Sequence, residues 1–265
     1  MLPKLSPHQA ETVRRTQEHF AREQGVTALL LGGSLAHGFA TPASDVDVMI
    51  VVSDDEHSDR LSTARSCFFS KELCTYESGY VDGKYISEGF IRKVNERGSE
   101  PARFAFKDAV VLFSKSETLP PLLEEVSRYP VAEKAERIRR FRAQFEAWFW
   151  YSGEALKKDD WPLFRTSIAK LSLFAGRAIL ARNELLYPYH KWFLRVLATA
   201  TDKPHGFDER LVALAHSPTR ADVEEFASMT RDFMGWEFEH VTWPPQFMLD
   251  SELNWLRQEP PVDDI

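Results

Sequence analysis

Residues 29–52 read LLLGGSLAHGFATPASDVDVMIVV, and this stretch decides the fold of the N-terminal part of the chain. An apolar run ends in a Gly-Gly-Ser turn, a short polar segment follows, and two aspartates open a second apolar run. The first run, 26–31, is short, apolar and bounded by glycine, which is typical of a buried strand. The second run, 46–52, has the same character. The sequence therefore predicts two strands with a polar turn between them.

The turn after the first strand has the composition of a phosphate-binding loop. Gly32 and Gly33 allow backbone angles that other residues resist, and they let a ligand approach the backbone closely. Ser34 is a good N-cap for a short helix at 35–37. Because free N–H groups at a helix start attract anions, we expect Gly33 and Ser34 to bind the phosphates of a nucleotide.

Asp45 and Asp47 begin the second strand and are the candidate metal ligands. Side chains two apart on a strand share one face, about 6.5–7 Å apart, so both carboxylates can bind oxygen-seeking Mg²⁺. Two such ions about 3.5–4 Å apart serve in-line phosphoryl displacement. Asp-x-Asp alone is more simply explained by aspartates that face water. The full pattern, in which ten residues separate Gly33-Ser34 from Asp45, favours a site.

This pattern resembles the signature of the DNA polymerase β-type nucleotidyltransferase superfamily, above all its small antibiotic and minimal nucleotidyltransferases. Gly38 and Ser44 match the signature as well. The resemblance implies transfer of a nucleoside monophosphate from an NTP, with ATP the expected nucleotide, and release of pyrophosphate. It also implies two Mg²⁺ ions held partly by Asp45 and Asp47, with the phosphates held by Gly33 and Ser34.

The resemblance further implies a third carboxylate on a neighbouring strand. Residues 75–81 and 84–91 are predicted to form a hairpin joined at Asp82-Gly83, a strong turn signal, so Asp82 is interpreted as a turn residue. Glu88 on the second of these strands is then the first candidate for a catalytic general base, ahead of Glu77 and Asp82. The alternative is that Glu88 faces solvent on an edge strand. Without a third acid, the chain would bind nucleotide and catalyse little or nothing.

The pattern of elements predicts an α+β fold with two domains, a mixed-sheet nucleotidyltransferase domain at 1–120 and an all-α helical bundle at 121–265. In the first domain we expect further helices at 7–24, 56–66 and 93–106 and a strand at 109–113. In the second we expect helices at 132–158, 161–186, 189–200, 207–215 and 219–234. The polar, proline-containing end at 259–265 is expected to be loosely held.

Two lysines of the helical half are candidate phosphate ligands. The resemblance implies that a helical domain shapes the acceptor pocket and supplies a lysine to the β- and γ-phosphates. Lys191 follows Pro188 at a helix start, where the helix dipole disfavours a cation unless an anion is near. Lys170 lies among apolar residues, which is an unusual setting for a charge. Each is equally well explained as a surface lysine whose stem covers apolar neighbours.

Composition narrows the function classes. A net charge of −7 argues against a large nucleic-acid surface and suits a cationic small substrate. No apolar run is long enough to span a membrane and the N-terminus lacks a signal region, so we expect a cytoplasmic protein of unspecified oligomeric state. We expect a nucleotidyltransferase that acts on a hydroxyl of a small, aminoglycoside-like acceptor. The alternative is a nucleotide-binding regulator or a protein-directed adenylyltransferase.

Overall fold

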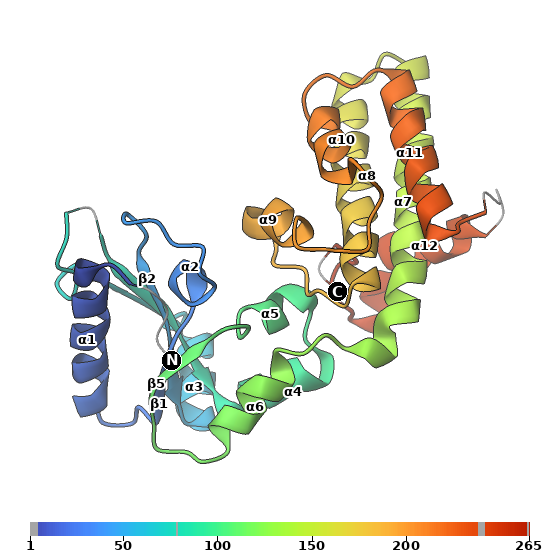
Figure 1. The fold of residues 1–265 in the computed structure, drawn as a ribbon. Coiled ribbons are helices and arrows are strands. Elements are labelled where there is room, and N and C mark those ends of the chain that lie inside the picture. The colour runs from blue at the N-terminus through green and yellow to red at the C-terminus, as the bar shows by residue number, and fades with distance from the viewer. Residues whose placement is uncertain (1–4, 78, 238–241, 264) are drawn as a thin grey trace. The chain divides into compact units, whose positions relative to one another are not determined.

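The chain divides into two units, Met1–Arg128 and Tyr129–Ile265 (Figure 1). The computed structural model describes residues 5–77, 79–237, 242–263 and 265. The first unit carries all five described strands, and the second is built from helices. The predicted α+β class, a mixed sheet followed by a helical region, is confirmed.

A five-stranded mixed sheet forms the centre of the first unit. Its strands are β1 (Ala28–Leu31), β2 (Val46–Val52), β3 (Cys67–Ser70), β4 (Val81–Ser87) and β5 (Val110–Ser114). Their order across the sheet is β3-β4-β2-β1-β5. The β2–β4 pair is parallel, and the other three pairs are antiparallel. The strand expected at 46–52 has those bounds, and the strand expected at 26–31 begins two residues later.

Helices cover both faces of this sheet because the central strands alternate two sets of apolar side chains. The helices are α1 (Pro7–Arg22), α2 (Gly33–Ala36), α3 (Asp54–Ser62), α4 (Glu88–Arg97), α5 (Glu100–Phe104) and α6 (Leu119–Val126). On one face, Phe20 of α1 belongs to the same core as Leu29 and Val48. On the other face, Ile91 of α4 and Leu122 of α6 share a core with Met49. The sheet is therefore buried on both sides, as near-continuous apolar strands require.

Two predictions for residues 75–106 are wrong. Asp82-Gly83 is not a turn: both residues lie inside β4, which is continuous from Val81 to Ser87. Gly83 is needed there because a Cβ would come within 2.6 Å of the main-chain oxygen of Val48 on the neighbouring strand. The strand expected to run to residue 91 ends at Ser87, whose hydroxyl accepts a hydrogen bond from the Phe90 amide and caps α4. The helix expected at 93–106 is accordingly α4 followed by α5.

The second unit is organised around two long helices that pack along one another. They are α7 (Lys134–Lys157) and α8 (Trp161–Arg182), and the short connection between them makes them antiparallel. The remaining elements are η1 (Val131–Glu133), η2 (His190–Trp192), α9 (Phe193–Leu197), α10 (Phe207–Leu214), α11 (Arg220–Met234), α12 (Trp243–Ser251) and η3 (Asn254–Arg257). The helix expected at 189–200 is thus two short pieces. Among the described helices, none is long and apolar enough to cross a membrane.

Three of the last residues, Val262, Asp263 and Ile265, are anchored, contrary to the prediction that 259–265 is loose; position 264 lies outside the described residues. Arg177 of α8 is fully buried, and its guanidinium donates to the main-chain oxygens of Asp263 and Ile265. The rings of Phe141 and Tyr187 lie 4.4 and 4.3 Å from the guanidinium carbon. A buried cation requires such partners, so Asp263 and Ile265 help to complete the core of the helical unit.

Candidate functional site

Three carboxylates of the first unit form one cluster. Asp45 precedes β2, Asp47 is its second residue, and Asp82 is the second residue of β4. The parallel register places Asp82 directly beside Asp47, and side chains at paired positions share one face of a sheet. One oxygen of each acid lies within 4.8 Å of an oxygen of the other two. The sheet therefore brings together acids that are far apart in sequence.

The cluster is suited to a hard divalent cation. All three aspartates are half-buried, so their oxygens remain accessible from solvent. Carboxylate oxygens at this spacing are the ligands that Mg²⁺ prefers, and without a cation the like charges repel one another. Such a repulsive group is costly as a purely structural feature, so the donor set fits a metal.

The negative charge of the carboxylate cluster changes the pKa of Tyr80. Its hydroxyl donates a hydrogen bond to the carboxylate of Asp45. That bond, together with the charges of the three aspartates, raises the pKa of Tyr80 to about 12. Its main-chain oxygen also accepts from the Val46 amide at 3.1 Å. Tyr80 thus orients the first acid of the cluster and stays protonated at neutral pH.

The Gly-Gly-Ser turn lies against the carboxylate cluster. The Gly32 amide donates to the main-chain oxygen of Asp47 at 2.9 Å. Gly33 has φ +60°, and a Cβ there would lie 1.7 Å from Oδ2 of Asp47. A side chain at position 33 would therefore overlap the carboxylate of Asp47, a candidate metal ligand. The turn and the acids, which the sequence joins in one pattern, are therefore in contact in the structure.

Ser34 supplies a polar atom for which the fold itself offers no use. The residue is 7 % exposed, and its hydroxyl has no hydrogen-bond partner in the described part of the chain. Burying a hydroxyl in this way costs free energy unless a ligand satisfies it. Because Ser34 follows a glycine with positive φ at the edge of the acid cluster, a phosphate oxygen bound beside the metal would fill that need.

His37, at the end of α2, connects this turn to the rest of the unit. Its side chain is almost fully buried, and Nδ1 lies 3.3 Å from a carboxylate oxygen of Asp108. Its ring is 4.6 Å from that of Phe104 at the ring centres. The hydrogen bond from His37 lowers the pKa of Asp108. These contacts hold the turn in place, so His37 has a structural role in the described arrangement.

Glu88 lies at the opposite end of β4 from the carboxylate cluster. Asp82 and Ser87, the residue before Glu88, are separated by roughly 17 Å along the strand. The carboxylate of Glu88 accepts a 2.6 Å hydrogen bond from the Thr118 hydroxyl and pairs with Arg92 at 3.1 Å. The structure therefore brings Asp45 and Asp47 together with Asp82, and it does not bring Glu88 to them.

The two candidate lysines belong to the helical unit. Lys191 lies in η2 and is exposed, with its Nζ 5.3 Å from the centre of the Trp192 ring. Lys170 lies in α8, where its ammonium group pairs with the carboxylate of Asp263. Their predicted contacts with phosphates stay predictions. Lys170 already has a structural partner that explains why it is tolerated among apolar neighbours.

Sequence reasoning ranked Asp82 too low and missed Tyr80. The Asp-Gly dipeptide was interpreted as a turn, whereas the glycine serves a close approach between strands. The available signal was the apolar residue Val81 directly before Asp82, together with a mostly apolar continuation over 85–86. Pairing this segment with the Asp-x-Asp strand in parallel would have aligned Asp82 with Asp47.

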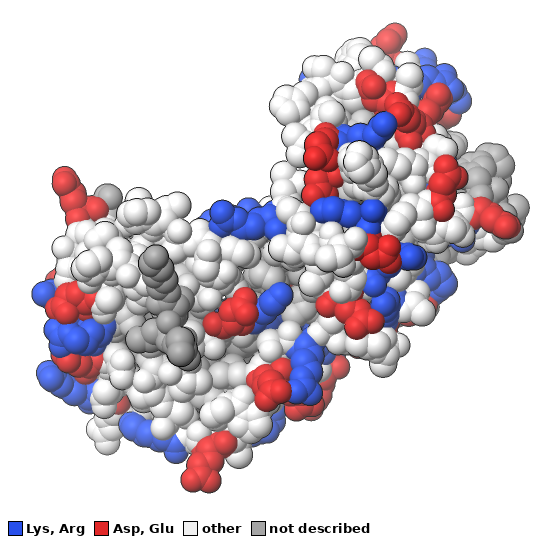
Figure 2. Space-filling model, in the orientation of Figure 1, with Lys and Arg blue, Asp and Glu red and all other residues white. Residues whose placement is uncertain are grey.

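The surface charges bear on the class of partner. Figure 2 shows lysine and arginine side chains interspersed with aspartate and glutamate side chains over the face in view. The described residues visible there form no continuous basic area. Nucleic-acid surfaces usually concentrate positive charge to contact phosphates, so this face lacks the features of one.

Comparisons with known proteins point to one kind of domain. Residues 13–117 match the family model described as nucleotidyltransferase domain, and this range contains the whole site described above. A solved nucleotidyltransferase-like protein from Exiguobacterium sibiricum 255-15 is similar in fold, with a TM-score of 0.50 and 10% sequence identity. The similarity covers 95% of this chain and 81% of that one. No curated protein matches the sequence. The resemblance inferred from the Gly33–Asp47 pattern is confirmed.

Proposed function

Since its residues 13–117 form a nucleotidyltransferase domain, we propose that this chain transfers a nucleoside monophosphate from magnesium-bound ATP to a hydroxyl of a small-molecule acceptor. Pyrophosphate is the second product. The observation that carries the proposal is the cluster of Asp45, Asp47 and Asp82 beside the Gly33-Ser34 turn. The net charge of −7 supports a cationic, aminoglycoside-like acceptor.

Each residue of the cluster has a role in this proposal. Asp45 and Asp47 hold Mg²⁺, with Asp82 as the third acid, and the ion would supply charge neutralisation on the triphosphate. Ser34 donates its hydroxyl to a phosphate oxygen, and the glycine at 33 lets the phosphates approach the backbone. Tyr80 keeps the carboxylate of Asp45 oriented toward the ligand side.

Asp82 is also the group that we assign to the acceptor's proton. The acceptor oxygen forms a bond to the α-phosphorus, and the bond from that phosphorus to the bridging oxygen of the β-phosphate breaks. The hydroxyl proton passes to the carboxylate of Asp82, and the electron pair leaves with pyrophosphate. Positioning and electrostatic stabilisation supply most of the rate in such transfers.

Calorimetric titration with ATP, with and without Mg²⁺, tests the binding half of the proposal. We expect affinity that depends on Mg²⁺ and is lost in the Asp45→Asn/Asp47→Asn variant. Affinity that ignores both Mg²⁺ and this double substitution would exclude the metal site. Glu88→Gln is the matched control, because it removes one acid of the same unit at the far end of β4.

Labelled ATP tests the acceptor half. The chain is incubated with α-labelled ATP and a panel of hydroxylated amines, and label is followed in small-molecule products and in protein bands. Label on an amine, with equimolar pyrophosphate, supports the proposal. Label on a protein alone favours the protein-directed alternative, and nucleotide binding without pyrophosphate release favours a regulator.

A further inference from the structure

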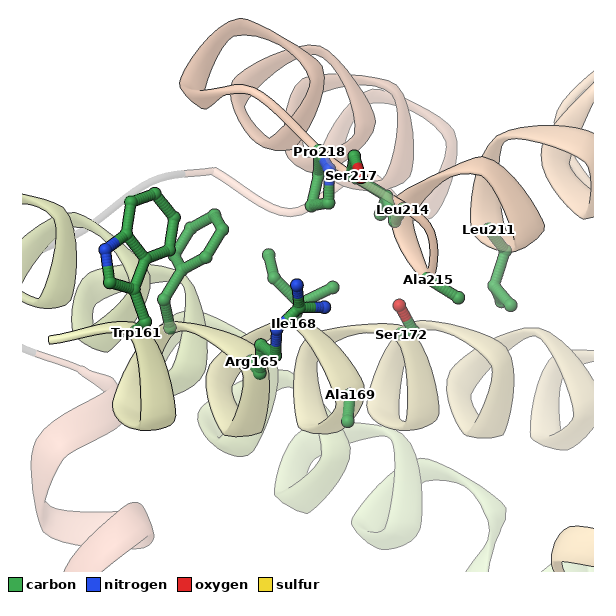
Figure 3. A pocket seen from close by; sticks show the side chains of 11 residues that line it. Trp161, Arg165, Ile168, Ala169, Ser172, Leu211, Leu214, Ala215, Ser217 and Pro218 are labelled. Atoms are coloured by element: carbon green, nitrogen blue, oxygen red, sulfur yellow. The ribbon is translucent and has the colours of Figure 1, made fainter.

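The helical unit contains a hollow that the proposed transfer does not use. It lies between α8, α10 and the segment that joins α10 to α11, and its volume is about 520 Å³ (Figure 3). Small-ligand sites usually measure about 300–1,000 Å³. All residues that line it belong to the second unit. We refer to it as the α8–α10 pocket.

The walls of the α8–α10 pocket are mostly apolar. Trp161, Phe164 and Ile168 line it from α8, and Leu211 and Leu214 line it from α10. Trp161 is 57 % exposed, although it packs edge-on against Phe164 with ring centres 5.9 Å apart. A large indole left open beside an apolar hollow would gain burial from a ligand. The walls therefore fit an alkyl chain or a single aromatic ring.

Arg165 is the one charged residue among those that line the pocket. In Figure 3 its side chain extends from α8 into the hollow, toward Ser217 and Pro218. It makes no ion pair or hydrogen bond with any part of the chain that the structure describes. Two other exposed arginines of this unit are paired, Arg210 with Glu225 and Arg220 with Glu224. The guanidinium is thus available to an anionic group.

The remaining polar groups of the pocket are compatible with an anion. Ser172 and Ser217 bring hydroxyls to its lining, and none of the described lining residues is acidic. Asp160, next to Trp161, is engaged as the N-cap of α8, where it accepts from the Leu163 amide at 3.0 Å.

We propose that the α8–α10 pocket binds a small monocarboxylate with an apolar body. The carboxylate pairs with the Arg165 guanidinium, whose fork geometry matches two carboxylate oxygens. The alkyl or aryl part lies against Ile168, Leu211 and the ring of Trp161. A single cation amid apolar walls suits a singly charged head group better than a phosphate dianion, which is usually bound by several donors. The proposal does not depend on nucleotide binding in the first unit.

Calorimetric titration of the full chain with octanoate and with octanol, in the absence of nucleotide, tests the pocket. We expect octanoate to bind about tenfold more tightly than octanol, as one charge-assisted pair provides. Arg165→Gln should abolish this preference. Arg220→Gln is the matched control, since it removes the same charge from an exposed helix outside the pocket and should leave both affinities unchanged.

A second variant locates the bound chain. Ser172→Leu places a larger side chain into the hollow at a half-buried helical position, and it should weaken octanoate and octanol alike while the thermal transition is kept. Equal affinities of the unsubstituted chain for the two probes, or equal losses in Arg165→Gln and Arg220→Gln, would overturn the carboxylate contact. Absence of binding, or binding that ignores Ser172→Leu, would overturn the pocket itself.

Discussion

Replacing Asp82 by asparagine should change stability in opposite directions with and without a divalent cation. Asp82 belongs to a cluster in which an oxygen of each acid lies within 4.8 Å of the others, so its charge takes part in two repulsive pairs. At 4.8 Å, one pair costs about 0.9 kcal/mol in a water-like dielectric. Lys84 lies on the same face and offsets part of this repulsion. We therefore expect Asp82→Asn to stabilise the metal-free protein by about 1 kcal/mol, or roughly 2–4 °C.

With Mg²⁺ present, the Asp82→Asn variant should be less stable than the unsubstituted chain. At a concentration 100 times the dissociation constant, a ligand that binds only the folded state stabilises it by about 2.7 kcal/mol. If the loss of one of three acids weakens binding about a hundredfold, the same concentration stabilises the variant by only about 0.4 kcal/mol. The variant would then be about 1 kcal/mol less stable than the unsubstituted chain, in spite of its advantage without metal.

Thermal unfolding followed by circular dichroism, with a Mg²⁺ series in each case, measures both effects. Glu88→Gln is the control, because it removes an acid whose partners are Thr118 and Arg92 and should keep the full Mg²⁺-dependent shift. The reasoning is refuted if Asp82→Asn keeps the shift of the unsubstituted chain. It is also refuted if Glu88→Gln loses that shift.

Three further perturbations follow from the described contacts. Gly33→Ala should lower the free energy of unfolding by about 1–2 kcal/mol, because residue 33 has a positive φ. It should also weaken Mg²⁺ binding, since the new Cβ would overlap Asp47. Urea unfolding and a metal titration measure the two effects. Arg177→Ala should destabilise the helical unit by about 3 kcal/mol or more and release the last residues to carboxypeptidase digestion, as time courses would report. Burial lowers the pKa of His57 from its usual 6.5. The contribution of neutral His57 to the free energy of unfolding is therefore fully present above about pH 6.5 and is lost as the pH drops toward the pKa of the folded state. Urea midpoints measured from about pH 5 to 8 should show this decrease, and His57→Gln should reduce it.

Matched variants separate specific effects from general damage. Gly38 also has positive φ, but a Cβ there meets nothing within 4 Å, so Gly38→Ala should carry only the backbone cost and leave Mg²⁺ affinity intact. Equal losses of Mg²⁺ affinity in the two alanine variants would contradict the overlap argument. A pH slope that persists in His57→Gln would assign it to other groups, and an undigested C-terminus in Arg177→Ala would contradict the anchoring role of Arg177.

Local sequence patterns predicted several helices and strands correctly, because interactions between residues close in sequence determine these elements. The helix expected at 7–24 is α1, which has a complete capping box at Ser6 and Pro7 in its first turn. The strand at 46–52 follows from an apolar run that is buried on both faces. Gly33, Ser34, Asp45 and Asp47 were identified together because one turn and one strand present all of them.

Longer-range pairing explains what the sequence did not reveal. Asp82 joins the site only because β4 pairs in parallel with β2, and a dipeptide that favours turns conceals such pairing. Gly83 is required by the nearby backbone of Val48, a close approach that no local pattern indicates. The anchored residues near the end of the chain have the same cause: Asp263 and Ile265 accept hydrogen bonds from Arg177, which precedes them by 86 and 88 residues.

The parallel register of β2 and β4 determines which changes in chain length the site can tolerate. Lengthening or shortening the segment between β3 and β4 leaves the pairing of Asp47 with Asp82 available. Deleting a single residue between Asp82 and the end of β4 would instead shift one part of the strand relative to the other, and side chains that move by one position point to the opposite face. Asp82 would then be directed into the apolar layer under α1. We therefore expect related sequences to differ in length before the position of Val81 and not within β4.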